Sequence, residues 1–217
     1  MASEVIYGRN PVREAQRGKR NVRQVWSSKD TSPEELTRRA GSPDHQGVVA
    51  EVDPYPYADP TTLLKDPQAL IVVLDQVQDP HNLGAVCRSA EAAGAAGVVI
   101  PERRAVGVTA AVAKASAGAV EHLAIARVRN LADWLGSARE SGAWVYGADE
   151  KADASYRTLD FSGRVVLVMG AEGSGIRPRV ASSCDAMVKI PTVGEVGSLN
   201  VSAAAAVLLF AASRAES

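Results

Sequence analysis

The sequence predicts an α/β fold in which a C-terminal domain with a mostly parallel sheet follows a small mixed α/β domain. From residue 69 onward, short runs of Val, Ile and Leu alternate with helical segments, and these runs lack the polar alternation of a half-exposed strand. The segment DPYPYADP at 53–60 holds three prolines, which favour an extended connector over a helix. We therefore divide the chain into an N-terminal domain at 1–53, a proline-rich linker at 54–67 and a C-terminal domain at 68–217.

The N-terminal domain is predicted to contain two helices and two strands. A turn at 8–11 leads into a helix that ends at Gly18, with the arginines outward. Its inward positions are Val12, Ala15 and Gln16. Ser32 precedes Pro33, the pattern of an N-cap followed by proline at the first helical position. The expected strands cover 22–26 and 48–52, and the second helix covers 31–40. With about 53 residues, this domain is marginal in size for independent stability.

The C-terminal domain is predicted to alternate strands and helices up to the end of the chain. Strands are expected at 70–74, 97–100, 144–148, 165–169 and 187–190, and helices at about 82–94, 108–117 and 131–141. The final helix is alanine-rich, and Ser198 is typical of its N-cap. Helical spacing puts five apolar residues on one side of this helix, which we expect to face the core. These are Leu199, Ala203, Ala206, Val207 and Phe210.

The net charge of −1 hides a basic N-terminus. Residues 1–29 hold seven Lys or Arg against two Glu, a local charge of +5, so the other 188 residues sum to −6. A basic block on a near-neutral protein suggests contact with phosphates, although such runs are more often a solvated surface.

The two cysteines indicate neither a disulfide framework nor a zinc site, because they lie far apart without a CxxC pair or a His-rich neighbour. Cys87 lies on the apolar stripe of its helix and is expected to be a core residue rather than a nucleophile. No apolar run is long enough to span a bilayer, and the N-terminus is charged where a signal peptide is apolar. We expect a cytoplasmic protein without a metal site.

Three segments that follow predicted strands combine glycines with polar residues, at 75–88, 167–175 and 190–200. The carboxyl end of a parallel strand is where open α/β sheets bind ligands. In the first segment, Arg88 lies roughly opposite the apolar stripe of its helix. Arg88 is therefore either a group that faces a ligand or a surface arginine near a helix start capped by Asn82.

The second and third segments favour close backbone approach to a ligand. The run GAEGSG at 170–175 matches neither a phosphate-binding Gly-Lys-Ser/Thr loop nor G-x-G-x-x-G, but its glycines allow a flat ligand to come near. In the third segment, Pro191 ends the strand, and Gly194 and Gly197 follow. Asn200 either solvates the helix end or serves the ligand.

These segments carry a family resemblance. The spacing N82-x-G84-x-x-x-R88, the run LVMGAEGSG at 167–175 and the run IPTVGEVGSLNVSAAAA at 190–206 resemble, in order, the three motifs of the SpoU (TrmH-like) family of RNA ribose 2'-O-methyltransferases, within the SPOUT superfamily. The N-terminal runs YGRNPVREA and HQGVVAEV resemble the L30e-like RNA-binding domain of the 23S rRNA guanosine 2'-O-methyltransferases of this family. The part between Arg23 and His45 is shorter than is usual there.

The resemblance implies S-adenosylmethionine as methyl donor, a deep C-terminal trefoil knot, and a homodimer whose active site is completed across the interface. The donor-binding residues it implies are Met169, Gly170, Ile190, Gly194, Ser198 and Leu199. The catalytic residues it implies are Asn82, Arg88, Glu172, Ser198 and Asn200. Because a guanidinium stays protonated in proteins, we expect Arg88 to clamp an RNA phosphate and stabilise the developing alkoxide, with a phosphate or water accepting the proton.

The resemblance also implies the substrate, a guanosine of 23S rRNA, with Arg9, Arg13 and Arg20 contacting phosphates. One alternative is a tRNA ribose 2'-O-methyltransferase of the same family. Another is a catalytically silent RNA-binding protein of the same fold. An NAD-binding domain is disfavoured because the G-x-G-x-x-G fingerprint is missing.

Overall fold

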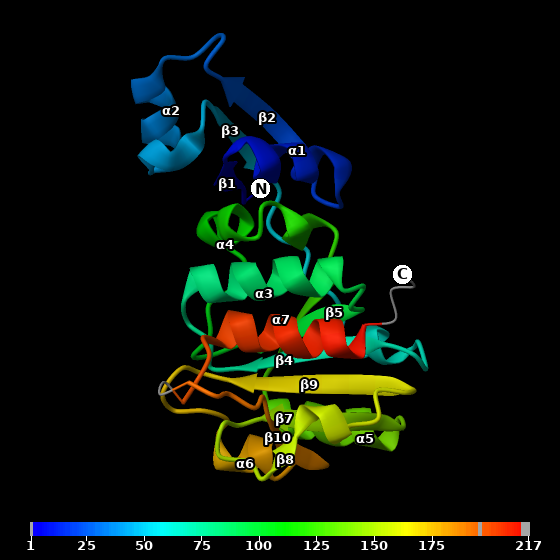
Figure 1. Cartoon of the computed structure of the whole chain (residues 1–217). Helices are drawn as coiled ribbons and strands as arrows, with labels where there is room; N and C mark the ends of the chain where they lie inside the picture. The colour runs from blue at the N-terminus through cyan, green and yellow to red at the C-terminus, as the bar shows by residue number, and fades with distance from the viewer. Residues whose placement is uncertain (1, 195–196, 214–217) are drawn as a thin grey trace.

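The computed structural model describes residues 2–194 and 197–213. Figure 1 shows a small sheet with two helices at one end of the molecule and a larger layered domain below it. The small sheet is antiparallel in the order β1-β3-β2. Its elements are β1 (Glu4–Tyr7), α1 (Arg9–Arg17), β2 (Val22–Ser27), α2 (Pro33–Ala40) and β3 (Val48–Val52).

The sequence predicted this small domain in part. Ser32 caps α2 by accepting a hydrogen bond from Glu35 N at 3.3 Å, as expected. Val12 and Ala15 are buried, whereas Gln16 is exposed, so the prediction for Gln16 was wrong. Strand β1 was missed, because four residues beside a turn carry too short a pattern to be recognised.

The large sheet has the order β6-β5-β4-β9-β7-β10-β8, and every strand pair described in it is parallel. This confirms the predicted α/β class. The strands are β4 (Leu70–Asp75), β5 (Gly97–Pro101), β6 (Ile125–Val128), β7 (Ala143–Ala148), β8 (Ala154–Ser155), β9 (Arg164–Gly170) and β10 (Ala186–Lys189). The short strands β6 and β8 were not predicted.

Helices cover both faces of this sheet, which explains why its strands are apolar throughout. Along β4, Leu70, Val72 and Leu74 enter one core, and Ile71 and Val73 enter the other. The first core lies under α3 (Pro80–Ala92), α4 (Ala110–Ala115) and α7 (Val201–Ala212), and the second under α5 (Leu131–Glu140) and α6 (Pro178–Ala181).

The starts of two helices differ from the predictions. Helix α3 begins at Pro80, and its N-cap is Asp79, whose carboxylate accepts from His81 N at 2.8 Å, so Asn82 is not the cap. Helix α7 begins at Val201 with Asn200 as its N-cap, so Ser198 is not the cap. In both cases a better-placed Asx side chain at the last non-helical position takes the exposed N–H groups.

The predicted core face of α7 was wrong. Its buried residues include Val201, Ala205 and Leu208, whereas Phe210 is 57% exposed and Val207 is 37% exposed. Because α7 is apolar on all sides, helical spacing alone does not determine which face meets the sheet. The helix therefore leaves an apolar strip on the surface of the single chain.

The proline-rich segment packs against the large domain. The hydroxyl of Tyr55 donates to Val120 O at 2.9 Å, and the hydroxyl of Tyr57 accepts from Val108 N at 2.8 Å. The first core continues across this junction, because Ile6 and Val12 belong to the same buried cluster as β4. The small sheet with α1 and the large sheet thus share one core.

Candidate active site

Three polar side chains, one from each of the three segments, meet at the carboxyl edge of the large sheet. Asn82 Nδ2 donates to Glu172 Oε1 at 3.2 Å, and Asn200 Nδ2 donates to Asn82 Oδ1 at 2.9 Å. Asn200 Nδ2 also donates to Glu172 Oε1. We call Asn82, Glu172 and Asn200 the polar cluster. It brings together residues that are 90 and 118 positions apart in the chain.

The N-cap of α7 fixes how Asn200 faces this cluster. Its Oδ1 accepts from Ser202 N at 2.9 Å and from Ala203 N at 3.4 Å. With the carbonyl held by the helix start, the NH₂ group points to Asn82 and Glu172 and uses both of its hydrogens there. A single side chain thus both starts the helix and orders the cluster.

A partly buried ion pair that no local sequence pattern indicated holds the second segment in place. Asp75, at the end of β4, is fully buried, and Arg177 follows the glycine-rich run. Arg177 N donates to Asp75 Oδ2 at 2.9 Å, and its Nε donates to Oδ1 at 2.8 Å. The available signal was a carboxylate closing a strand that is otherwise entirely apolar, but its partner lies 102 residues away.

Gly170 is required by the tight fold of its own loop. A Cβ on Gly170 would lie 2.2 Å from the carbonyl carbon of Gly175. Ala171 and Gly175 exchange backbone hydrogen bonds of 3.2 and 2.9 Å, and Gly173 and Gly175 have positive φ angles of 78° and 65°. The loop is therefore closed on itself beside the buried side chain of Met169.

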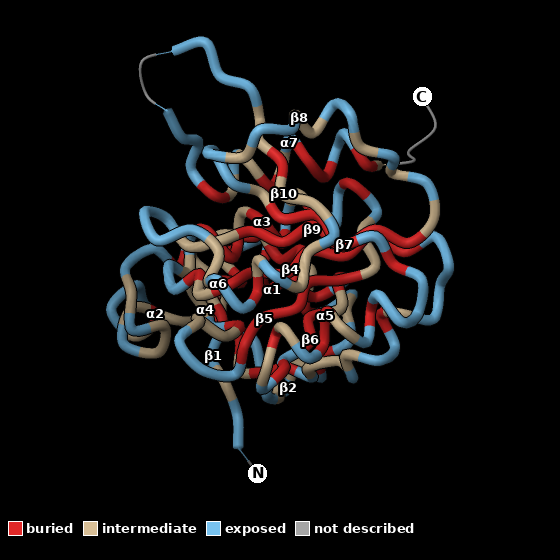
Figure 2. Tube along the Cα trace, turned by 90° about the horizontal axis from the view of Figure 1, so that it is seen from below, coloured by how far each residue is buried: buried red, intermediate tan, exposed pale blue. Residues whose placement is uncertain are grey.

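The third segment, at 190–200, differs from the second in having few contacts with the rest of the described chain. The described residues 191–194 and 197–199 are exposed, and none of their backbone groups forms a hydrogen bond with another described residue. Figure 2 shows this segment projecting from the body of the protein. Gly194, Ser198 and Leu199 are thus exposed on this projecting segment and make no contact with the side chains of the polar cluster that the structure records as a hydrogen bond, whereas the half-buried Ile190 packs against the core.

Arg88 lies on the exposed side of α3, as expected, and makes no hydrogen bond or ion pair with the described residues. Its neighbour Cys87 is fully buried, and burial raises the pKa of the thiol to about 12. Cys87 is therefore a core residue rather than a thiolate nucleophile. Gly84, one turn before Arg88, lets α3 approach α4, since a Cβ there would lie 2.5 Å from Ala115 Cβ.

One of the three arginines predicted to contact RNA is buried. Arg9 and Arg13 are exposed on α1. The guanidinium of Arg20 is instead enclosed at the junction of the two domains, where its Nε donates to both carboxylate oxygens of Glu121 at 3.1 and 3.0 Å. Its Nη1 donates to Glu4 Oε2 at 3.1 Å. The prediction for Arg20 is corrected, because a buried and neutralised guanidinium does not reach a phosphate.

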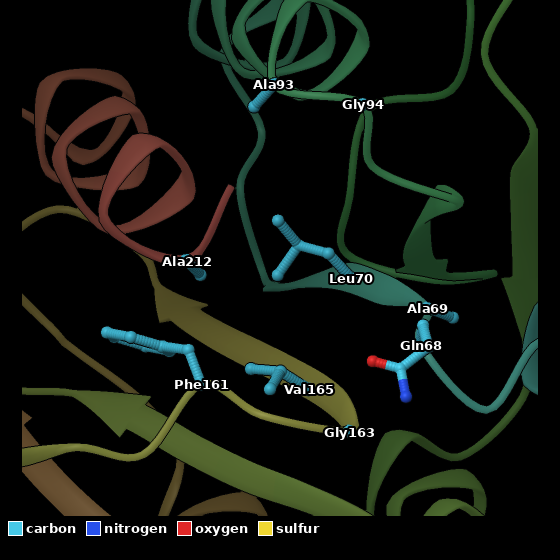
Figure 3. Close-up of a pocket in the computed structure, with 9 residues that line it drawn as sticks. All are labelled: Gln68, Ala69, Leu70, Ala93, Gly94, Phe161, Gly163, Val165 and Ala212. Carbon is cyan, nitrogen blue, oxygen red and sulfur yellow. The ribbon is translucent and has the colours of Figure 1, made fainter. Parts of the chain in front are cut away.

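A small cavity of about 60 Å³ lies at the opposite, amino edge of the sheet. Figure 3 shows it between the starts of β4 and β9 and the ends of α3 and α7, with Leu70, Phe161, Val165 and Ala212 in its wall. None of the described residues that line it is titratable, and it lies at the edge of the sheet opposite to the polar cluster. In the described part of the chain, no group of three or more His, Cys, Asp or Glu could hold a metal ion. No helix of this part has the length and apolarity needed to cross a membrane.

Residues 69–210 match the model of the SpoU rRNA Methylase family. A Bacillus subtilis protein, YacO, whose name assigns it to the TrmH family of tRNA/rRNA methyltransferases, is 39% identical over 95% of this chain and 94% of its own.

Two solved structures have the same fold over nearly the whole chain. An AdoMet-bound rRNA methyltransferase from Sinorhizobium meliloti has a TM-score of 0.86 at 26% identity, and covers 97% of this chain and 86% of that one. The AdoMet complex of the SpoU methyltransferase AviRb from Streptomyces viridochromogenes has a TM-score of 0.84 at 25% identity, and covers 97% and 89%. Both matches extend over the N-terminal small sheet as well as the large sheet.

Proposed function

Because this chain belongs to the SpoU rRNA methylase family, we propose that it methylates a ribose 2'-oxygen of RNA, with a guanosine of 23S rRNA as its target. The protein is an RNA methyltransferase, and S-adenosylmethionine is its methyl donor. The observation that carries the ribose assignment is the polar cluster, which collects one side chain from each of the three motifs at a single edge of the sheet. Its amide and carboxylate groups suit the orientation of a hydroxyl-bearing sugar.

The chain offers room and free backbone groups for the donor beside this cluster. Apart from their chain neighbours, no atom of the described residues lies within 4 Å of the position a Cβ would take on Gly194 or Gly197. The unpaired C=O groups of 191–194 and 197–199, and the N–H groups of these residues other than Pro191, are available for the polar edge of a nucleoside. Met169 and Ile190 provide apolar contacts. These features support donor binding by Met169, Gly170, Ile190, Gly194, Ser198 and Leu199.

When bound, S-adenosylmethionine supplies an electrophilic methyl group on a sulfonium. The protein then has to hold the ribose hydroxyl in line with that methyl group, and alignment of this kind is worth about 7–11 kcal/mol. The ribose is oriented by hydrogen bonds to the polar cluster. Asn82 and Asn200 offer their amide groups, and Glu172 offers its second carboxylate oxygen. Ser198, on the free segment, adds a hydroxyl on the donor side.

We assign Arg88 to the phosphate next to the target ribose and to the charge that develops on the 2'-oxygen. A guanidinium keeps its proton in proteins, so it acts as a clamp and an electrostatic stabiliser, while a phosphate or water accepts the proton. Its exposure and its lack of a partner among the described residues support this role. The positive charge of Arg88 can therefore pair with an anionic group of a ligand.

Arg88→Ala tests this assignment. We expect calorimetry to show parental affinity for S-adenosylmethionine, and methyl transfer to RNA to fall at least 100-fold, which corresponds to about 2.7 kcal/mol. A variant that keeps parental transfer would show that Arg88 is only a surface arginine.

Mapping of 2'-O-methyl groups on 23S rRNA and on tRNA, with and without the gene, identifies the target. Methylation confined to tRNA would establish the alternative substrate, and donor binding without transfer by the parent would establish a silent RNA-binding protein.

We further propose a homodimer, a knotted C-terminal domain, and an L30e-like RNA-binding role for residues 1–53. The exposed strip of α7, with Val207 and Phe210, supports an interface between two copies, because such apolar surface gains by burial. Phe210→Glu should convert a dimer to a monomer in sedimentation equilibrium. A parent chain that sediments as a 22.7 kDa monomer would contradict the dimer.

A further inference from the structure

The loop that follows β5, residues 102–109, lies beside the candidate site. Strand β5 pairs directly with β4, and β6 pairs with β5, all in parallel. Their carboxyl ends, at Pro101, Asp75 and Val128, therefore share one edge of the sheet. Since neighbouring strands are about 4.8 Å apart, the ends of β5 and β6 lie roughly 5–10 Å along this edge from the end of β4.

Backbone hydrogen bonds fix this loop at both ends and attach it to the first site segment. Val106 N donates to Val77 O at 3.2 Å, and Val77 lies between β4 and α3. At the start of the loop, Glu102 N donates to Val128 O at 2.9 Å, and at its end Val108 N donates to the Tyr57 hydroxyl at 2.8 Å. The loop is held in one conformation next to the segment that carries Asn82.

Two arginines of this loop, Arg103 and Arg104, have no partner for their charge in the described part of the chain. Among the arginines that the structure describes, three make no hydrogen bond, ion pair or ring contact, namely Arg88, Arg103 and Arg104. The others are engaged, for example Arg13 with Glu14 at 2.7 Å. Arg103 and Arg104 are both exposed and lie side by side in the 102–109 loop.

The surroundings of this pair add further positive charge. Arg129, at the end of β6, is 92% exposed and reaches Glu102 only at 3.8 Å. Arg127 donates to the carbonyl oxygen of Glu102 at 3.0 Å, which leaves its charge uncompensated by that carboxylate. Arg103, Arg104, Arg127 and Arg129 thus contribute four positive charges here, and Glu102 contributes one negative charge. This contrasts with the residues after Lys29 as a whole, which sum to −6.

The backbone of Arg104 adds a second observation. Its φ angle is +59°, in the left-handed region that non-glycine residues adopt uncommonly. The neighbouring contacts of Val106 and Val108 maintain this conformation. A strained, fixed loop that bears two unpartnered arginines is typical of a binding surface.

We propose that Arg103 and Arg104, with Arg129 beside them, bind backbone phosphates of the RNA strand that presents its ribose to the polar cluster. This inference rests on the proposed function and adds a second phosphate-binding surface, on the catalytic domain, to that expected on residues 1–29. Arginine suits this role because its planar guanidinium binds phosphate through two parallel hydrogen bonds. Such contacts position the strand without reading its bases.

The test is the salt dependence of RNA binding by the full chain carrying Arg103→Gln and Arg104→Gln. The probe is fluorescently labelled 23S rRNA transcribed in vitro, titrated between 50 and 200 mM salt. Each phosphate contact on single-stranded RNA contributes about 0.7 to the slope of log K against log salt, so the double variant should lose about 1.4. At saturating RNA, kcat should stay near the parental value while KM for RNA rises.

A matched control removes two charges from the amino edge of the sheet, with Lys65→Gln and Arg139→Gln. Lys65 is exposed ahead of β4, and a glutamine at 139 keeps a donor for Asp185, which Arg139 contacts at 2.8 Å. This control should keep the parental slope. Donor affinity, measured by calorimetry on the same preparations, should be unchanged in all variants.

Three results would overturn the proposal and one supports it. A double variant with the parental slope shows that the surface does not contact RNA, and leaves the proposed function intact if the parent binds donor and RNA. An equal loss of slope in the control shows a general charge effect instead. A parent that binds neither S-adenosylmethionine nor RNA would overturn the proposed function as well. Loss of slope in the double variant alone supports the surface.

Discussion

The glycine-rich segment at 167–175 and the segment at 191–199 are both expected to hold the donor, yet they are built in opposite ways. The first is tied to the sheet by the Asp75–Arg177 ion pair and closed by hydrogen bonds between Ala171 and Gly175. The second, in its described residues, has no backbone hydrogen bond to the rest of the described chain. One wall of the site is thus preformed, and the other has its polar groups free for ligand or partner contacts.

Replacing the buried carboxylate should have the largest effect on the preformed wall. Asp75→Asn removes the charge that Arg177 neutralises, and we expect a loss of about 1–3 kcal/mol in the free energy of unfolding, measured in urea. Asp133→Asn is the matched control, because its ion pair with Arg179 at 3.0 Å is exposed on both sides. The control should cost less than about 1 kcal/mol. Equal losses in the two variants would show that Asp75 does not anchor the loop.

Asn200 links the preformed wall to the start of α7, and its two roles can be separated. Asn200→Ala should lose about 0.5–2 kcal/mol of stability through the missing N-cap. Asn200→Ser should recover most of this, because serine is also a good N-cap, but it does not reproduce the NH₂ group that contacts Asn82 and Glu172. Methyl transfer should therefore stay impaired in both variants. Recovery of transfer in the serine variant would indicate that only the cap matters.

The smallest effect on stability is expected in the free segment. Gly194→Ala adds a methyl group where no atom lies within 4 Å, and Gly194 is not among the glycines with positive φ. Its free energy of unfolding should stay within about 0.5 kcal/mol of the parent. Donor affinity should fall about tenfold, a loss of roughly 1.4 kcal/mol, if this backbone contacts the ligand. Unchanged affinity in calorimetry would remove Gly194 from the donor site.

The same contrast explains what the sequence could predict. Strand runs such as LIVVL and VVLVM are apolar on both faces, so the parallel sheet and its ligand edge followed from composition and order. The motif residues Asn82, Glu172 and Asn200 were identified by family spacing, and their mutual contacts are consistent with it.

The remaining features depend on tertiary contacts that no local pattern contains. The Asp75–Arg177 pair joins positions 102 residues apart, and Arg20 finds Glu121 at a separation of 101. In the sequence, Arg20 looks like any other member of a basic block. Similarly, an alanine-rich helix such as α7 has no polar face to indicate its orientation.

The buried contact between Arg20 and Glu121 also determines how this protein could be recombined with its relatives. The proline-rich stretch looks like a natural crossover point, but a chimaera cut there would separate Arg20 from its carboxylate and Tyr55 from the carbonyl of Val120. The enclosed carboxylate of Glu121 would lose its partner, although Arg20 would keep Glu4. An uncompensated buried charge costs about 3–5 kcal/mol, a large part of a typical domain's stability. The unit of exchange is therefore residues 1–53 together with Tyr55 and the 119–123 turn. A functional graft has to transfer these segments as one block.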